Sequence, residues 1–353
     1  MSTLFLNKIC APLFVFSHRH CSSIFNSRTL PIISQTPTTK TARPLYSKTT
    51  AAILTDTNSN LETIIVEEEV SKCTNLLACP ICYRPLVWNG APLSVGSTSG
   101  VVLQCRACKK SYIGIETHLE LTIVSETNEY GELMPAATEL FRTPLVSYLY
   151  ERGWRQGFGL GGFPGPEKEF EMSKEYLKPV LGGNIIDASC GSGMFSRLFA
   201  KSGLFSTVIA LDFSENMLKE CYQFIQQEEN FPKEKLTLVR ADIARLPFVS
   251  SSIDAVHAGA ALHCWPSPSI AVSEISRVLR PGGVFVATTY IADGPFSALP
   301  IVKDIRERIG QVSGSRIFLS EGEFEELFSA CGLVGFTCVR YGVFVMLSAA
   351  KPS

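Results

Sequence analysis

The first 55 residues of the 353-residue chain contain no aspartate and no glutamate, and the first acidic residue is Asp56. The same stretch carries six lysine or arginine residues and 16 serine or threonine residues. A basic, hydroxyl-rich segment without acids is typical of an organelle transit peptide, and its start, Met-Ser-Thr-Leu, is typical of plant plastid signals. We therefore predict a disordered plastid transit peptide over residues 1–55 and a chloroplast location. A disordered tail without a targeting function is the alternative.

Long apolar runs are also lacking. Apolar stretches such as residues 343–347 have the length of a strand, whereas a membrane-spanning helix needs roughly 20 apolar residues. The composition, with 46% hydrophobic and 18% charged residues, excludes a mainly disordered chain. We expect no transmembrane segment, and a peripheral association with plastid lipid surfaces is compatible with the sequence.

No excess of positive charge indicates a nucleic-acid-binding protein. The formal net charge is −1, and removal of residues 1–55 would leave 26 basic and 33 acidic residues, a charge of about −7. Nucleic acid is therefore a less natural partner than a small molecule, because binding to its phosphates depends on lysine and arginine.

The twelve cysteines do not indicate a disulfide framework. Two lie in the expected transit peptide, and six are scattered in apolar surroundings, where cysteine usually packs as a small hydrophobic residue. The other four form two C-x-x-C pairs, Cys79 with Cys82 and Cys105 with Cys108, separated by 22 residues. This distribution favours a thiol-rich compartment such as the plastid stroma over secretion.

The two cysteine pairs predict a structural zinc site. Each C-x-x-C can form a tight turn that directs two sulfurs to one point, and two such turns give the tetrahedral S4 coordination that Zn2+ favours. The flanks, residues 85–88 and 101–104, are typical of hairpin strands, and fewer than 60 residues build little core without a metal. Two redox-active motifs are the alternative. We expect this ribbon to have a core of its own, so that the larger domain stays folded without metal.

Residues 77–82 and 103–115 resemble the short zinc ribbons found beside methyltransferases. Some of these ribbons are separate activator subunits, and others are fused to bacterial rRNA guanine methyltransferases. Ile113 and Glu116 stand where such ribbons often have proline. The resemblance implies an intact metal site, whereas the two departures put an inherited partner surface in doubt.

From residue 185 on, apolar runs of strand length alternate with amphipathic segments, which is the pattern of a parallel sheet with helices on both faces. Ser320 and Glu323 form an S-x-x-E capping box before a last helix, and residues 333–349 are expected to form an antiparallel hairpin at the sheet edge. The predicted fold class is α/β, a doubly wound, mostly parallel seven-stranded sheet preceded by the small ribbon. Five strands are expected at 184–187, 207–212, 236–240, 255–259 and 284–290. The predicted domains are the transit peptide at 1–55, the zinc ribbon at 70–125, a linker or lid at 126–172 and the α/β domain at 173–353.

Four loops follow these strands, and ligands of such sheets bind beyond the carboxyl ends of the strands. The first loop contains Gly191 and Gly193, the second begins at Asp212, the third contains Asp242, and the fourth spans residues 256–265. A nicotinamide site would share the glycines and an acid at a strand end. It would also need a third glycine where Ser196 stands, which makes that alternative weaker.

In this order, the loops resemble those of class I S-adenosylmethionine-dependent methyltransferases, particularly the small-molecule branch with quinone-biosynthesis enzymes. The resemblance covers about residues 173–350, and the family usually has glycine where Ser189 stands. The whole layout resembles a group of plant chloroplast methyltransferases. The resemblance implies S-adenosyl-L-methionine as the cofactor and a set of cofactor-binding residues, namely Asp187, Gly191, Gly193, Asp212, Phe213, Met217, Asp242 and Ile243.

Within that set, the resemblance implies that the two glycines hold the methionine part and that Asp187 helps to place its ammonium. It implies that Asp212 binds the ribose and that Asp242 with the Ile243 amide addresses the adenine. His263 and His257 are the nearby candidates for a base. Of these we favour His263, as a catalytic base or as a substrate contact, although a histidine in such a loop is often only a packed residue.

The segment before the first strand combines aromatic residues, cations and glycines, and in related enzymes it folds over the cofactor as a lid. The candidate substrate contacts are Trp154, Arg155 and Phe158 in this segment and Trp265 in the fourth loop. A linker packed by its own aromatics is the alternative.

We therefore expect methyl transfer to a small apolar acceptor, phenolic or quinone-like, in the plastid. An RNA methyltransferase is the first alternative, because fused ribbons occur in rRNA enzymes. A cofactor-binding scaffold without catalytic activity is the second.

Overall fold

The computed structural model describes residues 76–88, 93–123, 139, 142–155, 157, 159, 162–291, 319–342 and 344–353. All of these belong to one compact unit, residues 58–353. The predicted transit peptide, residues 1–55, lies outside the described residues. In the described part of the chain, no helix is both long and apolar enough to cross a bilayer.

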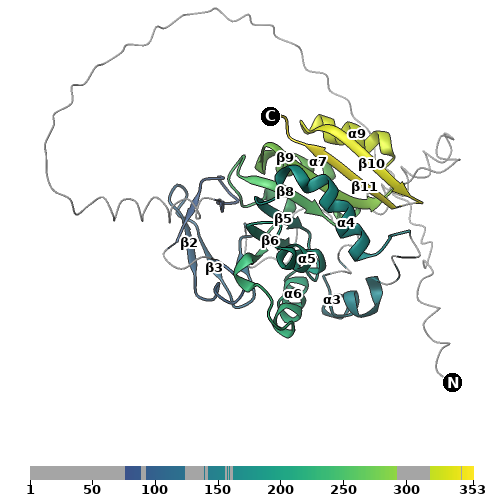
Figure 1. The fold of residues 1–353 in the computed structure, drawn as a ribbon. Coiled ribbons are helices and arrows are strands. Elements are labelled where there is room, and N and C mark those ends of the chain that lie inside the picture. The colour runs from purple at the N-terminus through teal and green to yellow at the C-terminus, as the bar shows by residue number, and fades with distance from the viewer. Residues whose placement is uncertain are drawn as a thin grey trace, which may run out of the picture. The chain divides into compact units, whose positions relative to one another are not determined.

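A single mixed sheet of eleven strands organises the described chain, in the order β1-β2-β3-β4-β7-β6-β5-β8-β9-β11-β10 (Figure 1). The first four strands are β1 (Leu86–Val87), β2 (Val102–Cys105), β3 (Ser111–Gly114) and β4 (Leu119–Glu120). The other seven are β5 (Asn184–Ala188), β6 (Thr207–Asp212), β7 (Leu236–Arg240), β8 (Ile253–Ala258), β9 (Leu279–Tyr290), β10 (Val334–Tyr341) and β11 (Phe344–Ala350).

The α/β part has the seven strands that the sequence predicts. Strands β7, β6, β5, β8 and β9 are parallel, and β11 and β10 complete the sheet as an antiparallel hairpin. Strand β9 begins five residues before the predicted position, because Leu279 already pairs with Ile253. The strand order reverses between β5 and β8, and such a switch point opens a crevice for ligands.

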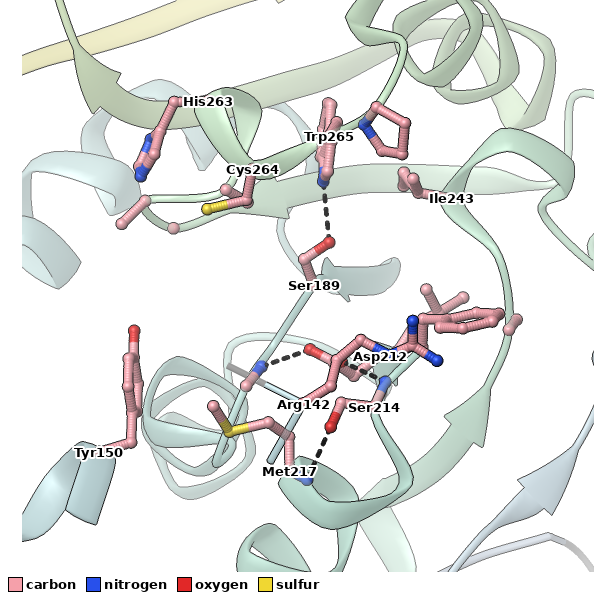
Figure 2. A pocket seen from close by; sticks show the side chains of 18 residues that line it. Arg142, Tyr150, Ser189, Asp212, Ser214, Met217, Ile243, His263, Cys264 and Trp265 are labelled. Atoms are coloured by element: carbon pink, nitrogen blue, oxygen red, sulfur yellow. Dashed lines mark hydrogen bonds between the residues drawn. The ribbon is translucent and has the colours of Figure 1, made fainter. Parts of the chain in front are cut away.

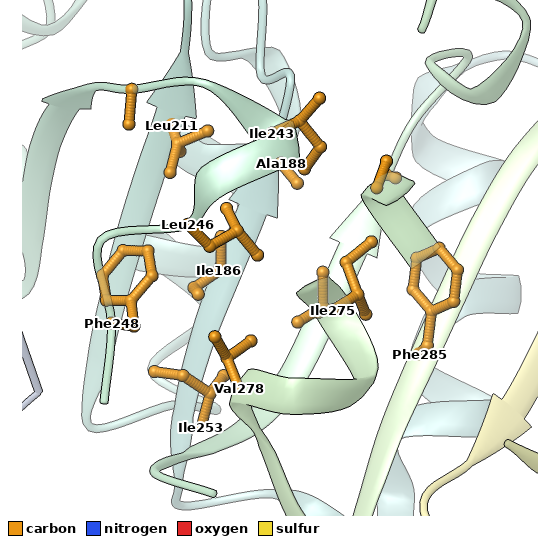
Figure 3. Packing of buried hydrophobic residues seen from close by; sticks show 14 of the residues in the cluster. Ile186, Ala188, Leu211, Ile243, Leu246, Phe248, Ile253, Ile275, Val278 and Phe285 are labelled. Carbon is orange, nitrogen blue, oxygen red and sulfur yellow. The ribbon is translucent and has the colours of Figure 1, made fainter. Parts of the chain in front are cut away.

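Helices cover both faces of the sheet, because both faces of its central strands are apolar. In β5, Ile185 belongs to one buried cluster and Ile186 to the other, as the alternation of side chains along a strand requires. The first cluster packs under α4 (Pro166–Leu177), α5 (Met194–Ser202) and α6 (Glu215–Gln227). The second packs under α7 (Pro268–Val278) and α9 (Glu321–Ala330), as Figure 3 shows for Ile275 and Val278.

Short helical elements complete the described chain. They are α3 (Pro144–Leu149), the π-helical η1 (Tyr150–Trp154) and the 3-10 turns η3 (Lys178–Val180), η4 (Lys233–Lys235), η5 (Ile243–Arg245) and η6 (Leu262–Cys264). The predicted capping box at the start of α9 is present. The Ser320 amide donates to Glu323 Oε2 at 2.8 Å, and the Glu323 amide donates to Ser320 Oγ at 3.3 Å.

The ribbon extends the large sheet. Strand β4 pairs with β7 in parallel, with Leu119 opposite Val239 and Glu120 opposite Arg240. The prediction that the ribbon has a core of its own is wrong, because Cys79, Leu103 and Leu119 share one buried cluster with Ile186. The sequence did not reveal this pairing, since a two-residue strand carries almost no periodic signal.

Candidate active site at the switch point

A pocket lies beyond the carboxyl ends of the parallel strands and contains about 860 Å3 of empty space, part of it open to solvent (Figure 2). All four predicted loops and the segment before the first strand contribute to its wall. The lining residues are Arg142 and Tyr150 from the segment, Ser189 and Gly191 from the first loop, Leu211, Asp212, Phe213, Ser214 and Met217 from the second, Ala241 and Ile243 from the third, and Gly259, Ala260, Ala261, His263, Cys264, Trp265 and Pro266 from the fourth.

The two predicted glycines of the first loop have different surroundings. Gly191 has φ 57° and lines the pocket, where a bare backbone leaves room for a ligand. Gly193 is the N-cap of α5 and packs against α6, because a Cβ there would lie 2.1 Å from Cys221 Sγ. Gly193 is therefore needed for helix packing, and of the two only Gly191 lines the pocket.

Asp187 lies behind the pocket wall. Its side chain is buried and accepts hydrogen bonds from Ser196 Oγ at 2.5 Å, and its Oδ1 lies 2.8 Å from His257 Nδ1. His257 is buried against the rings of Phe195 and Phe199. This pair links β5 to β8 at the base of the crevice, and neither residue lines the pocket.

Asp212, at the end of β6, faces the pocket with its carboxylate held by two backbone amides. Gly191 N donates to Oδ2 at 2.8 Å, and Ser214 N donates to Oδ1 at 2.7 Å (Figure 2). Each carboxylate oxygen keeps a further lone pair for a ligand. Burial raises the pKa of Asp212 to about 6, although the two amides act in the opposite direction.

The residues after Asp212 shape the same wall. Met217 lines the pocket at the start of α6, and its amide donates to Ser214 Oγ at 3.3 Å. The Phe213 ring lies under two guanidinium groups, with Arg142 4.8 Å and Arg240 5.4 Å from the ring centroid. The two predicted residues Phe213 and Met217 therefore lie together with Asp212.

The third loop places Ile243 in the pocket wall, whereas the predicted Asp242 does not line the pocket. Asp242 is the N-cap of η5, and its Oδ1 accepts from Ala244 N at 2.8 Å. Ile243 lines the pocket as the first residue of η5, whereas Arg245, its last residue, extends to the ribbon. Arg245 Nε donates to Pro80 O at 2.7 Å, and its Nη2 donates to Ile81 O at 3.0 Å.

The fourth loop provides both predicted residues, His263 and Trp265. His263 Nδ1 lies 3.0 Å from Thr289 Oγ1, and burial lowers the pKa of His263 to about 4. The imidazole is therefore neutral near pH 7. Trp265 is only 4% exposed, and its Nε1 donates to Ser189 Oγ at 2.9 Å across the pocket (Figure 2).

The segment before the first strand covers the first loop and is held there by ion pairs. Glu151 binds Arg197 at 2.6 Å and accepts from Ser192 Oγ at 2.6 Å, and Arg152 binds Glu220 at 2.6 Å. These contacts join η1 to α5 and α6.

Tyr150 lines the pocket from this segment, as Arg142 does, and the sequence analysis selected neither residue. The only available signal for Tyr150 was its place in an aromatic stretch. Arg155 Nη1 lies 3.4 Å from the Tyr150 hydroxyl, and Arg155 also pairs with buried Glu169 at 3.7 Å. Burial raises the pKa of Glu169 to about 7. Among the other predicted substrate contacts, the Trp154 side chain and all of Phe158 lie outside the described residues.

The four ribbon cysteines form one cluster whose sulfurs all lie within 4.8 Å of one another. Cys79 and Cys108 are 3.5 Å apart, and Cys82 lies 3.4 Å from Cys105 and 3.9 Å from Cys108. Zn–S bonds of about 2.3 Å in a tetrahedron place sulfurs roughly 3.8 Å apart. The donor set and its spacing therefore fit a zinc ion.

The chain is similar to known methyltransferases. The model of the methyltransferase domain family matches residues 186–287. Two proteins of Arabidopsis thaliana named as chloroplastic methyltransferases are 69% identical over 281 residues, covering 79% of each chain, and 47% identical over 306 residues, covering 84% of this chain and 83% of theirs. A demethylmenaquinone methyltransferase of Staphylococcus aureus is 34% identical over 125 residues, which are 33% of this chain and 50% of that protein.

Proposed function

The chain belongs to the S-adenosylmethionine-dependent methyltransferases, as a plastid member beside its two Arabidopsis relatives, and from this premise we propose that its methyl acceptor is a small apolar molecule, phenolic or quinone-like. The pocket wall carries this proposal. Of its 18 lining residues, only Arg142 and Asp212 have side chains that are charged near neutral pH. Apolar pockets with few polar groups are typical of small-molecule sites.

We propose that the second and third loops hold the adenosine part of the cofactor. Asp212 would accept hydrogen bonds from the ribose hydroxyls, and Ile243, Phe213 and Met217 would enclose the adenine. The Gly191 backbone would approach the methionine part, whereas Asp187 would act on its ammonium only from behind the loop. Bound S-adenosylmethionine supplies a methyl group that its sulfonium already activates.

The protein then has to align the acceptor and exclude water, because in-line attack on such a methyl group needs little further activation. Tyr150 and Trp265 would form the apolar walls beside the acceptor, and Arg155 would support the Tyr150 hydroxyl. We propose that His263 orients an acceptor oxygen. Its pKa of about 4 makes it a poor base toward a phenol, so a contact role is better supported than proton removal.

The partial relative from Staphylococcus aureus supports the acceptor class, because its name states a quinone-type substrate. The test is transfer of labelled methyl groups from S-adenosylmethionine to fractionated plastid extract, with Asp212→Ala as the inactive control. Label in the organic phase supports the proposal. Label in RNA alone would replace it with an RNA methyltransferase, and no label in any fraction would favour a cofactor-binding scaffold.

We also propose that Cys79, Cys82, Cys105 and Cys108 bind one structural zinc ion. Metal analysis of the purified protein should find about one zinc per chain, and Cys105→Ser should abolish it. Protein without metal and with a Cys79–Cys82 disulfide would refute this site.

Peripheral association with plastid lipid is a further part of the proposal. The outer face of α3 exposes Leu145, Tyr148 and Leu149, at 68%, 50% and 41%. These residues are three and four positions apart and so share one helix face, beside the pocket that would receive an apolar acceptor. Co-sedimentation with vesicles of plastid lipid composition should decrease in Leu145→Glu, and equal sedimentation of both proteins would contradict this association.

A further inference from the structure

A hydrogen bond crosses the crevice at the switch point. Ser189 directly follows β5, and Trp265 lies in the loop after β8, the strand next to β5. The Trp265 indole N–H donates to Ser189 Oγ at 2.9 Å, and both residues line the pocket (Figure 2). At the base of the same crevice, Asp187 and His257 join the two strands without lining the pocket. Of these two links, the bond between Trp265 and Ser189 is therefore the one that a ligand in the pocket would meet.

The backbone at Ser189 makes this bond informative. Ser189 has φ 56°, in the left-handed region where an L side chain is strained and glycine is not. Glycine would relieve that strain but would remove the acceptor for the indole N–H. The backbone geometry thus favours glycine, and the described contact that a serine adds is the bond to Trp265.

We propose that Ser189 is a positioning residue for cofactor binding, which fixes the Trp265 indole so that the first and fourth loops enclose the cofactor as one preformed wall. Without the bond, the buried indole can adopt other rotamers and its loop other backbone conformations. Only a fraction of the molecules then has the conformation of the wall that binds the cofactor. The apparent affinity for S-adenosylmethionine falls by that fraction. The proposal rests on the cofactor site proposed above, and its test measures cofactor binding without an acceptor.

Two substitutions separate positioning from folding. Ser189→Ala keeps the strain and loses the bond, so its Tm should fall by about 2–4 °C. Ser189→Gly loses the bond but also relieves the strain, so its Tm should stay within about 2 °C of the wild type. Both should bind S-adenosylmethionine about 3- to 10-fold more weakly by calorimetry, because both have lost the same hydrogen bond.

Ser251→Gly is the matched control. Ser251 also has a positive φ, 58°, and its hydroxyl accepts from Lys351 Nζ at 3.2 Å, outside the pocket. Its affinity for S-adenosylmethionine should be unchanged, which shows that relief of backbone strain does not by itself weaken binding.

The indole itself provides a direct signal. The chain has three tryptophans, so protein labelled with 5-fluorotryptophan should give three fluorine resonances, and Trp265→Phe assigns one of them. That resonance should broaden or shift in both Ser189 variants before any ligand is added. In a double-mutant cycle, Ser189→Ala combined with Trp265→Phe should bind no more weakly than Trp265→Phe alone, within about twofold.

Two results would overturn the proposal. In the first, affinity follows Tm, so that Ser189→Ala binds weakly and Ser189→Gly binds like the wild type; Ser189 is then only structural. In the second, both variants bind like the wild type and the Trp265 resonance is unchanged.

Discussion

Substitution of Arg245 by alanine should weaken both the ribbon and the cofactor site. Arg245 ends η5, the turn whose first residue, Ile243, lines the pocket. Its guanidinium donates to the carbonyls of Pro80 and Ile81, within the first C-x-x-C turn, and lies 5.2 Å from the Tyr83 ring centroid. One side chain thus connects the turn that would bind adenine to the turn that would bind zinc.

The magnitude follows from these two hydrogen bonds. Bonds from a charged donor contribute roughly 1.5–3 kcal/mol each when buried, but the bond to Ile81 is exposed and must be discounted. We expect a total loss of about 2–3 kcal/mol and a fall in Tm of about 4–10 °C. Arg245→Lys can restore only one of the two bonds and should lie between the variant and the wild type.

The assay combines thermal unfolding, calorimetry with S-adenosylmethionine and the rate of zinc release to a chelator. Arg245→Ala should release zinc faster and bind the cofactor about 3- to 10-fold more weakly. Because coupling between two sites is reciprocal in binding free energy, the cofactor should raise the zinc affinity of the wild type, measured by equilibrium competition with the chelator, but raise that of this variant much less. Arg84→Ala is the matched control, because Arg84 is an exposed arginine just after the same C-x-x-C turn. A variant with wild-type affinity, zinc release and Tm would refute the reasoning.

Three further predictions follow from the site and the ribbon. If the ionised Asp212 binds the ribose as proposed, the cofactor affinity of the wild type should fall by up to about tenfold per pH unit below pH 6, because burial raises the pKa of Asp212 to about 6. Asp212→Asn should bind weakly at every pH, and an equally steep profile in that variant would exclude Asp212 as the titrating group. For Asp212 alone, the same shift means that the ligand-free protein gains stability as the pH falls from about 6 to 4. Cys105→Ser should lower the Tm of the ribbon and the α/β part together, as one calorimetric transition, because the ribbon shares its buried cluster with β5. An unchanged transition of the α/β part would show that the shared cluster does not couple the ribbon to the α/β part. Glu151→Gln should speed cofactor dissociation in stopped-flow experiments about 2- to 10-fold by weakening the pair with Arg197, and an unchanged rate would show that the segment is not a lid.

The strands of the α/β part could be predicted because each carries its own local signal. The apolar runs at 207–212 and 236–240 coincide with β6 and β7, and the capping box at Ser320 marks the start of α9 correctly. The sequence likewise predicted that Gly191 and Asp212 lie at one edge of the sheet, since the topology of a parallel sheet brings its loops together there, and both residues line the pocket. Their role in cofactor binding stays a prediction.

The remaining contacts depend on tertiary structure and leave no local pattern. Nothing near Ser189 indicates that an indole 76 positions later donates to it. The sequence placed Asp187 in the cofactor site, but its position behind the wall depends on His257, 70 residues away. Gly193 was grouped with Gly191 because both belong to one motif, although only the packing of α5 on α6 gives them different tasks.

The pairing of β4 with β7 also has a consequence for solubility. In an α/β domain that began at residue 173, β7 would be an edge strand with unpaired amides and carbonyls, and a buried, apolar edge strand is a template for aggregation. The ribbon covers that edge and moves the end of the sheet to β1, which has only two residues. At the opposite end, β10 is largely exposed and has a register shift between Val334 and Thr337, which also disfavours edge-to-edge pairing. Truncation to the methyltransferase domain alone should therefore yield aggregates in place of a smaller active enzyme.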